Sequence, residues 1–128
     1  MKLALALLLA LLPRVDPALQ AEWRNAITEW SPYVPLVREV RWYDGADCED
    51  TYGGGGWNER QRVILICTPI LHDLRLIMLH EYGHALLGYG HVLRSERLSI
   101  MNDGWMEPYG TEVTAEDKAA VKRLREKR

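Results

Sequence analysis

Residues 80–91 read His-Glu-Tyr-Gly-His-Ala-Leu-Leu-Gly-Tyr-Gly-His, and this stretch decides which fold and which chemistry the chain is expected to have. It lies in a longer segment, residues 70–87, that is apolar nearly all round and therefore predicts a buried helix. Four residues advance a helix by about 400° and about 6 Å, so His80 and His84 project from one face, one turn apart. Two imidazoles placed in this way can bind one tetrahedral zinc ion.

Glu81 follows the first histidine and lies beside the face that carries both rings. A carboxylate in that position can accept a proton from a metal-bound water and pass it to a leaving amine. The HExxH spacing alone is a moderately specific signal for such a site. The apolar helix strengthens it, because polar groups buried without partners cost on the order of several kcal/mol and metal binding satisfies them.

His91 is the third histidine of the stretch. In a continuous helix it would lie about 10.5 Å further along the axis than His84, too far to share one ion. Gly88 and Gly90 favour an end to the helix, because glycine leaves helical geometry at little steric cost. A turn at these glycines would bring His91 to the same metal. The fourth histidine, His72, lies near the expected helix start, where we expect a structural or surface role.

The segments before the helix predict one further helix and two strands. Apolar residues at helical spacing predict a helix over residues 17–30, and β-forming residues predict strands over 36–43 and 62–67. Residues 44–58 contain four consecutive glycines, Gly53 to Gly56, which favour a flexible loop or a wide hairpin connection. Thr68 and Pro69 are typical of an N-cap and a first helical residue.

A final helix is predicted after the motif. No clear period runs through residues 89–109, and Thr114 then opens a helix as its N-cap, with Asp117 in a variant capping box. The inner face of this helix consists of Ala119, Ala120, Val121 and Leu124.

Composition limits the function classes. The chain has 128 residues and a mass of 14.7 kDa, which fit one domain. Its net charge of −2 and pI of 6.1 offer no field to attract nucleic acid or anionic lipid. We therefore expect neither partner, and the oligomeric state stays open.

The N-terminus has the pattern of a secretory signal. Lys2 is followed by ten apolar residues and then by Pro13, and such a stretch is too short for a stable membrane anchor. We expect a signal peptide over residues 1–21 and a single domain over 22–128, in a secreted or extracytoplasmic protein, periplasmic in a bacterium with an outer membrane. An apolar helix packed on the domain is the alternative, and the cleavage site is open: Ala18 and Ala21 are candidates, yet Asp16 and Pro17 also form a helix-start pattern.

Two cysteines, Cys48 and Cys67, allow one pairing. In an oxidising compartment they would form a disulfide that stabilises the fold by about 3 kcal/mol. Two buried thiols in a reducing cell are the alternative, and the spacing does not favour metal binding.

The motif and the residues after it resemble a known family. HEYGHALLGYGH followed by Ser99-Ile100-Met101-Asn102 is similar to the metzincin signature with its Met-turn, specifically to the matrixin branch of zinc endopeptidases. Residues 26–40 resemble the first helix and strand of a matrixin catalytic domain, and residues 113–124 resemble its closing helix. One departure lies in the motif itself, since the second and third histidines are seven residues apart rather than six.

The resemblance implies a role for each matched residue. His80, His84 and His91 would be the ligands of one catalytic Zn²⁺, Glu81 the general base and acid, and Met101 the apolar floor beneath the metal. Gly88 would end the helix, and residues 103–109 would wall the pocket for the substrate side chain beyond the cut. A strand edge before the active-site helix would bind an extended peptide by β-augmentation.

We therefore expect an α+β, minimal metzincin-like domain: a small twisted sheet, a helix behind it, an active-site helix and a C-terminal helix. The expected function is that of an exported zinc-dependent endopeptidase, which hydrolyses protein or peptide substrates with a metal-activated water and Glu81 as general base. Trp57 and Trp105, in glycine-bearing loops, are candidates for substrate contact.

Three alternatives remain. Another metalloprotease layout uses two histidines and a downstream glutamate, for which Glu96, Glu107 and Glu112 are candidates. A secreted, non-catalytic zinc-binding module with a metzincin-like cleft belongs to a different class. The third reads the histidines as a structural zinc staple, which would require a fourth protein ligand.

Overall fold

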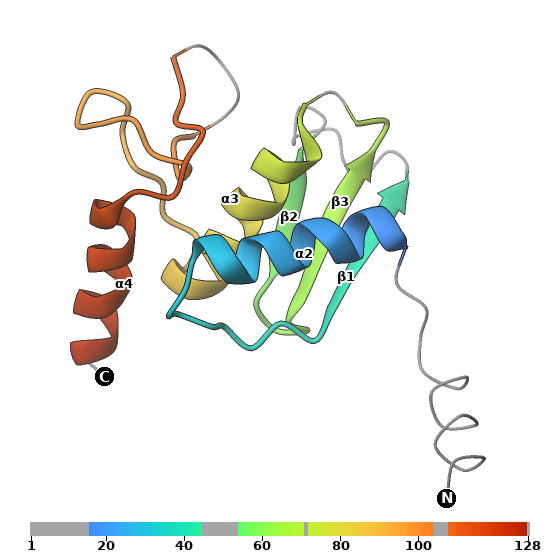
Figure 1. Ribbon diagram of the computed structural model, residues 1–128, viewed down its shortest axis with the longest axis horizontal. Helices are drawn as coiled ribbons and strands as arrows, with labels where there is room; N and C mark the ends of the chain where they lie inside the picture. The colour runs from blue at the N-terminus through green and yellow to red at the C-terminus, as the bar shows by residue number, and fades with distance from the viewer. Residues whose placement is uncertain (1–15, 45–53, 71, 104–107, 128) are drawn as a thin grey trace, which may run out of the picture.

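The computed structural model describes residues 16–44, 54–70, 72–103 and 108–127, which form three helices and a three-stranded sheet (Figure 1). In chain order the elements are α2 (Pro17–Glu29), β1 (Glu39–Asp44), β2 (Gly55–Asn58), β3 (Val63–Thr68), α3 (Leu74–Leu87) and α4 (Ala115–Glu126). The predicted α+β class is confirmed at this level.

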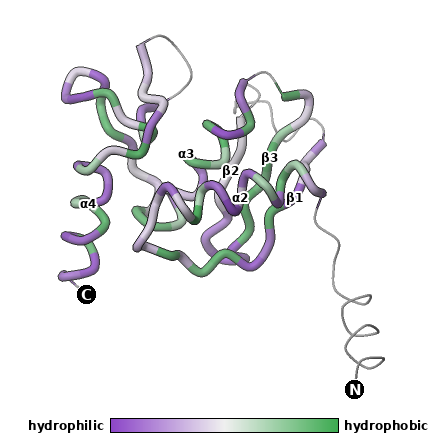
Figure 2. The backbone as a smooth tube through the Cα atoms, in the orientation of Figure 1, coloured by the Kyte–Doolittle hydropathy of each residue, from purple (hydrophilic) through white to green (hydrophobic). Residues whose placement is uncertain are grey.

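β3 is the central strand of the sheet, whose order is β1-β3-β2. β1 runs parallel to β3, with Glu39 opposite Val63, and β2 runs antiparallel to it, with Gly55 opposite Ile66. Figure 2 shows that β3 is hydrophobic over most of its length, as a strand buried on both faces requires. The two predicted strands are thus present, each shifted by one to three residues.

β2 was not predicted as a strand, since glycines were expected to leave this segment irregular. Gly55 pairs with Ile66 and packs closely against α3: a Cβ atom there would lie 2.5 Å from the Leu65 carbonyl oxygen and 3.1 Å from Glu81 Cγ. The glycine therefore permits close packing of the strand on α3. Trp57 lies on this strand, buried, rather than in a loop.

Substitution of Gly55 tests this packing. Gly55→Ala should lower the free energy of unfolding by about 1–3 kcal/mol, because backbone or helix must move to admit the methyl group. Gly56→Ala is the matched control, since a Cβ there meets nothing within 4 Å. Urea denaturation of both variants measures the difference. Equal stability of the two would contradict the packing argument.

The core lies between the sheet and the helices α2 and α3, both of which pack against strands, while α4 contacts α3 (Figure 1). Trp30 joins the two helices: it is fully buried, and its indole N–H donates to the Leu79 carbonyl at 3.0 Å. The buried cluster to which it belongs contains residues from each element, including Leu19, Ile64, Ile77, Tyr82 and Val121. Of the predicted inner face of α4, Val121 is fully buried and the other three members are partly buried.

The helix starts agree with prediction at α2 and α4 but not at α3. Asp16 caps α2, accepting from the Ala18 N–H at 2.8 Å, and Thr114 and Asp117 form the predicted capping box of α4. The prediction that Thr68 caps the buried helix was wrong. Thr68 ends β3, where its hydroxyl donates to the Tyr43 carbonyl at 3.3 Å.

The buried helix instead begins at Leu74, with Asp73 as its N-cap. The Asp73 carboxylate accepts from the Arg75 N–H at 2.8 Å, which satisfies one of the unpaired donors of the first turn. His72 therefore precedes the helix and lies outside it.

Two predictions concern residues that the structure does not describe. Residues 1–15 of the predicted signal lie outside the described part of the chain, while α2 continues through both candidate cleavage positions and buries Leu19. Within the described residues, no helix has the length and apolarity needed to cross a membrane. Cys67 is buried on β3, and Cys48 lies outside the described residues, so the disulfide stays a prediction.

Candidate metal centre

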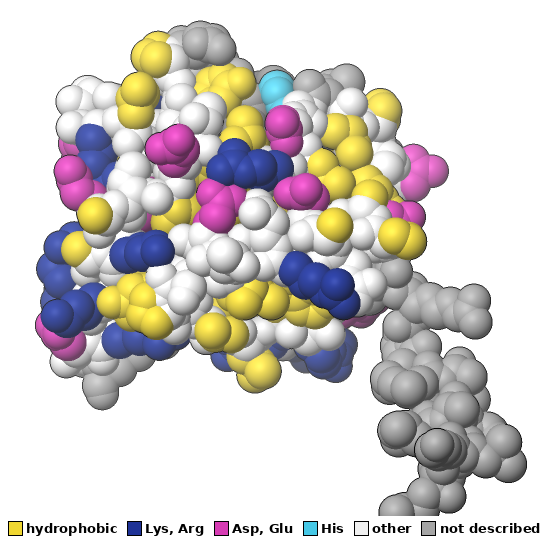
Figure 3. All heavy atoms as spheres, viewed as in Figure 1, with side chains coloured by type: hydrophobic (Ala, Val, Ile, Leu, Met, Phe, Trp, Pro, Cys, Tyr) yellow, Lys and Arg dark blue, Asp and Glu magenta, His cyan; other side chains and the backbone are white. Residues whose placement is uncertain are grey.

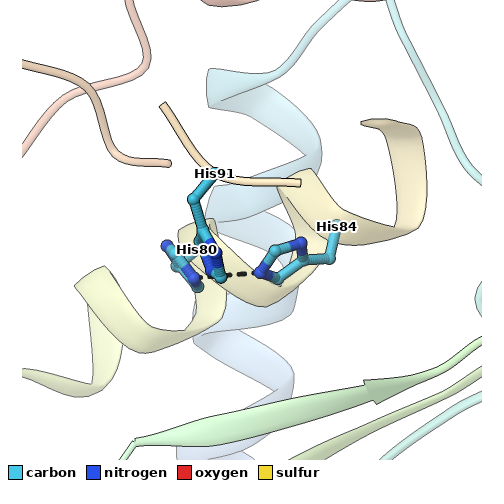
Figure 4. A group of neighbouring side chains, drawn as sticks. All are labelled: His80, His84 and His91. Carbon is cyan, nitrogen blue, oxygen red and sulfur yellow. Dashed lines mark hydrogen bonds between the residues drawn. The ribbon is translucent and has the colours of Figure 1, made fainter. Parts of the chain in front are cut away.

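Three histidines converge on one point at the end of α3 that faces the following loop (Figure 4). His80 and His84 come from successive turns of α3, and His91 comes from the loop that follows it. One ring nitrogen from each residue lies within 4.8 Å of the others, and these are the described residues that could hold a metal ion together. The structure thus brings together all three ligands predicted from the sequence.

Main-chain carbonyls orient two of the rings. His80 Nδ1 lies 2.6 Å from the Ile100 carbonyl oxygen, and His84 Nδ1 lies 2.7 Å from the Gly88 carbonyl oxygen. A carbonyl oxygen only accepts, so Nδ1 carries the proton and donates in both rings. The neutral rings therefore have no proton on Nε2, and each Nε2 presents a lone pair.

These two lone pairs face each other, since His80 Nε2 and His84 Nε2 are 3.0 Å apart (Figure 4). Two nitrogen lone pairs at this distance repel unless a cation lies between or beside them. Burial and the neighbouring His84 lower the pKa of His80 to about 4, and burial also lowers the pKa of His84. At neutral pH a proton is therefore not the favoured cation. A metal ion fits, because ligands of tetrahedral zinc are separated by about 3.4 Å.

Gly88 ends α3 and so allows His91 to lie close to the other two histidines. It ends α3 with φ 88°, a value open to glycine, and its N–H donates to the His84 carbonyl at 2.8 Å. The chain then turns back, and Val92 N–H donates to the Met101 carbonyl at 2.9 Å. The ring of His91 comes to rest 4.8 Å from that of His84, centre to centre, so the seven-residue spacing is absorbed in the turn.

Met101 packs against α3, the helix that carries His80 and His84. Its side chain is buried against α3 at Gly83, where a Cβ atom would lie 2.3 Å from the Met101 sulfur and 2.8 Å from Trp30 Cζ2. Only a glycine at position 83 lets residues 99–102, here called the Met101 loop, approach the helix so closely. The approach also places the Ile100 carbonyl beside His80.

Polar residues hold the Met101 loop in this position. Ser99 Oγ accepts from the Met101 N–H at 2.9 Å and donates to the buried carboxylate of Asp117 at 2.6 Å. Asn102 donates to the carbonyls of Val92 and Arg97 at 3.0 and 3.1 Å. The cap of α4 is thus linked through this loop to His80, which contacts the Ile100 carbonyl, and to His91, which precedes Val92.

Glu81 is the carboxylate nearest in sequence to the ligands, and it is buried. Burial raises its pKa to about 8. Its neighbour across the interface is Gly55 of β2. Glu81 thus follows His80 directly on α3, and its side chain lies against β2.

The alternative ligands do not join the group. Glu96 and Glu112 are described and lie outside it, while Glu107 and Trp105 belong to the residues that the structure does not describe. Sequence reasoning named Asn102 only as a member of the stretch similar to the Met-turn, and it did not identify Asp117 as part of the site. The capping pattern at Thr114 was a signal for Asp117, but its contact with Ser99 joins residues 18 positions apart.

No protein-family model, curated protein or solved structure matches this chain. What is shown therefore rests on its own residues: a small α+β domain with three histidines that are able to hold a metal ion.

Proposed function

We propose that this protein is a zinc-dependent endopeptidase of the metzincin type, related in layout to the matrixins. The contact that carries the proposal joins the two bare Nε2 atoms, 3.0 Å apart on a helix that also presents Glu81. A structural staple explains the histidines but gives no role to a buried glutamate beside them.

The residues have distinct roles in the proposed reaction. His80, His84 and His91 would hold the metal ion, each through one ring nitrogen. A zinc ion would supply a lower pKa for a water molecule and polarisation of a carbonyl group. Glu81 would take up a proton at its carboxylate and deliver it to the leaving amine.

The edge strand β2 supports the binding of an extended peptide. It lies at one side of the sheet and packs against α3, so a peptide added to its edge would pass beside Glu81. A cavity of about 520 Å³ opens at this strand, lined by residues 56–60 with Leu65 and Tyr89. Trp57 belongs to the lining and is the tryptophan we expect to contact a substrate side chain.

Export is a further part of the proposal. It rests on the apolar segment after Lys2, and in an oxidising compartment Cys48 and Cys67 would then form a disulfide. Basic and acidic side chains are interspersed on the face shown in Figure 3, in keeping with a peptide rather than a nucleic acid as substrate.

Zinc content and cleavage of an unfolded protein test the proposal. The purified chain should contain one zinc ion, cut the substrate, lose activity with a chelator and regain it with added zinc. Bound zinc without cleavage of a peptide library would favour the non-catalytic zinc module. Absence of zinc binding would overturn the metal centre itself.

His91→Ala should reduce zinc affinity by about 100-fold or more, because the loss of a ligand exceeds the effect of losing a supporting contact. His72→Ala is the matched control, since His72 lies outside the group. Competition with a chelator of known affinity measures both. Unchanged affinity in His91→Ala would move the third ligand to a glutamate.

A further inference from the structure

Two of the three histidines have a hydrogen-bond acceptor fixed by the main chain, and the third has a different partner. Ile100 and Gly88 supply carbonyls to His80 and His84. The group that faces Nδ1 of His91 is a side chain, the carboxylate of Asp103, with Oδ1 3.9 Å away. At this distance the two groups are ion-pair neighbours rather than a hydrogen-bonded pair.

Two hydrogen bonds hold the main chain around Asp103 close to the segment that carries His91. The preceding residue, Asn102, donates to the carbonyl of Val92, which directly follows His91. A guanidinium nitrogen of Arg94 donates to the carbonyl of Asp103 itself. The side chain of Asp103 is 82% exposed, so its carboxylate can rotate towards the ring without displacing packed atoms.

We propose that Asp103 is a positioning residue that accepts a hydrogen bond from Nδ1–H of His91 and so directs Nε2 of that ring to the metal. The inference rests on the metal site of the proposed function but not on catalysis. Such a contact fixes the tautomer and the orientation of the ring and increases the basicity of the ligand. It gives His91, which comes from a loop, the support that main-chain carbonyls give to the helix histidines.

Zinc affinity of the folded full chain tests the role. Asp103→Ala should weaken zinc binding by about 10-fold or more, whereas Asp103→Asn keeps an acceptor oxygen and should lose less than about threefold. Glu126→Ala is the control for net charge, since Glu126 is exposed on α4, away from the histidines. Circular dichroism checks that each variant is folded.

A spectroscopic measurement supplies the second readout. In the zinc-loaded protein, long-range ¹⁵N–¹H correlation of the imidazoles should show His91 coordinated through Nε2 with a proton on Nδ1. Coordination through Nδ1, or an Asp103→Ala affinity within twofold of the Glu126→Ala value, would overturn the inference while leaving the endopeptidase proposal intact. If the unaltered chain binds no zinc, the proposed function fails first.

Discussion

Glu81→Gln is expected to lower peptide hydrolysis by about 10²–10⁴-fold while zinc remains bound and the metal-free fold becomes more stable. Gln has the size of Glu and cannot take up a proton from water, so the chemical step loses its general base. The three ligand nitrogens belong to other residues, and metal affinity should therefore change little. Loss of activity together with a gain in stability distinguishes a proton acceptor from a residue that supports the fold.

The gain in stability has a defined pH dependence. Burial raises the folded-state pKa of Glu81 from 4.5 to about 8, so its stabilising contribution is complete below pH 4.5 and is lost as pH rises towards 8. Gln does not ionise and loses nothing over this range. The metal-free variant should therefore match the unaltered chain near pH 4.5 and exceed its stability by an amount on the order of 4 kcal/mol near pH 8.

Glu22→Gln is the control, because burial also raises the pKa of Glu22, which lies on α2 away from the histidines. This variant should keep full activity. Initial rates on one peptide, zinc content and urea denaturation at several pH values complete the comparison. Activity in Glu81→Gln above about a tenth of that of the unaltered chain would remove Glu81 from the mechanism.

The parts of the fold that could be predicted are those set by local pattern. Helical spacing located α2, and the motif placed His80 and His84 on one face of α3, because four residues make about one turn whatever lies nearby. The capping box of Thr114 and Asp117 is equally local. Such features depend on residues close in sequence, which the chain itself displays.

The parts that could not be predicted depend on packing between distant residues. The glycines of β2 have low strand propensity. Gly55 nevertheless pairs with Ile66 in the sheet, at a position where Leu65 and Glu81 leave no room for a side chain. Thr68 has the pattern of a helix cap, yet its hydroxyl is bound to β1. In both cases a tertiary contact decided between two locally acceptable structures.

The candidate site divides in the same way. The three candidate ligands followed from spacing and glycine positions, whereas the orientation of His80 and His84 depends on the carbonyls of Ile100 and Gly88. The Ile100 carbonyl comes from a loop 20 residues away from His80, and nothing local indicates it. Asp117, which contacts Ser99 of that loop from α4, could not be found from the motif.

Asp117→Ala is expected to destabilise the protein by about 3–5 kcal/mol, a large part of the roughly 5–15 kcal/mol typical of a domain. The carboxylate is fully buried and accepts from the Ser99 hydroxyl at 2.6 Å, from Arg97 at 2.8 Å and from the Thr114 N–H at 2.9 Å. Its removal takes the acceptor from the Ser99 hydroxyl and the Thr114 N–H, and leaves the partly buried Arg97 charge without its closest partner.

Glu116→Ala is the matched control, one residue away. Glu116 also pairs with Arg97, at 3.1 Å, but its side chain is 74% exposed, so its loss should cost less than about 1 kcal/mol. Urea denaturation followed by tryptophan fluorescence compares the two, and zinc affinity at low urea shows whether the site weakens with the fold. Equal destabilisation would mean that the acidic charge near Arg97 matters and the link to Ser99 does not. A much larger effect of Asp117→Ala would mean that the cap of α4 holds the Met101 loop, and with it the carbonyl that orients His80.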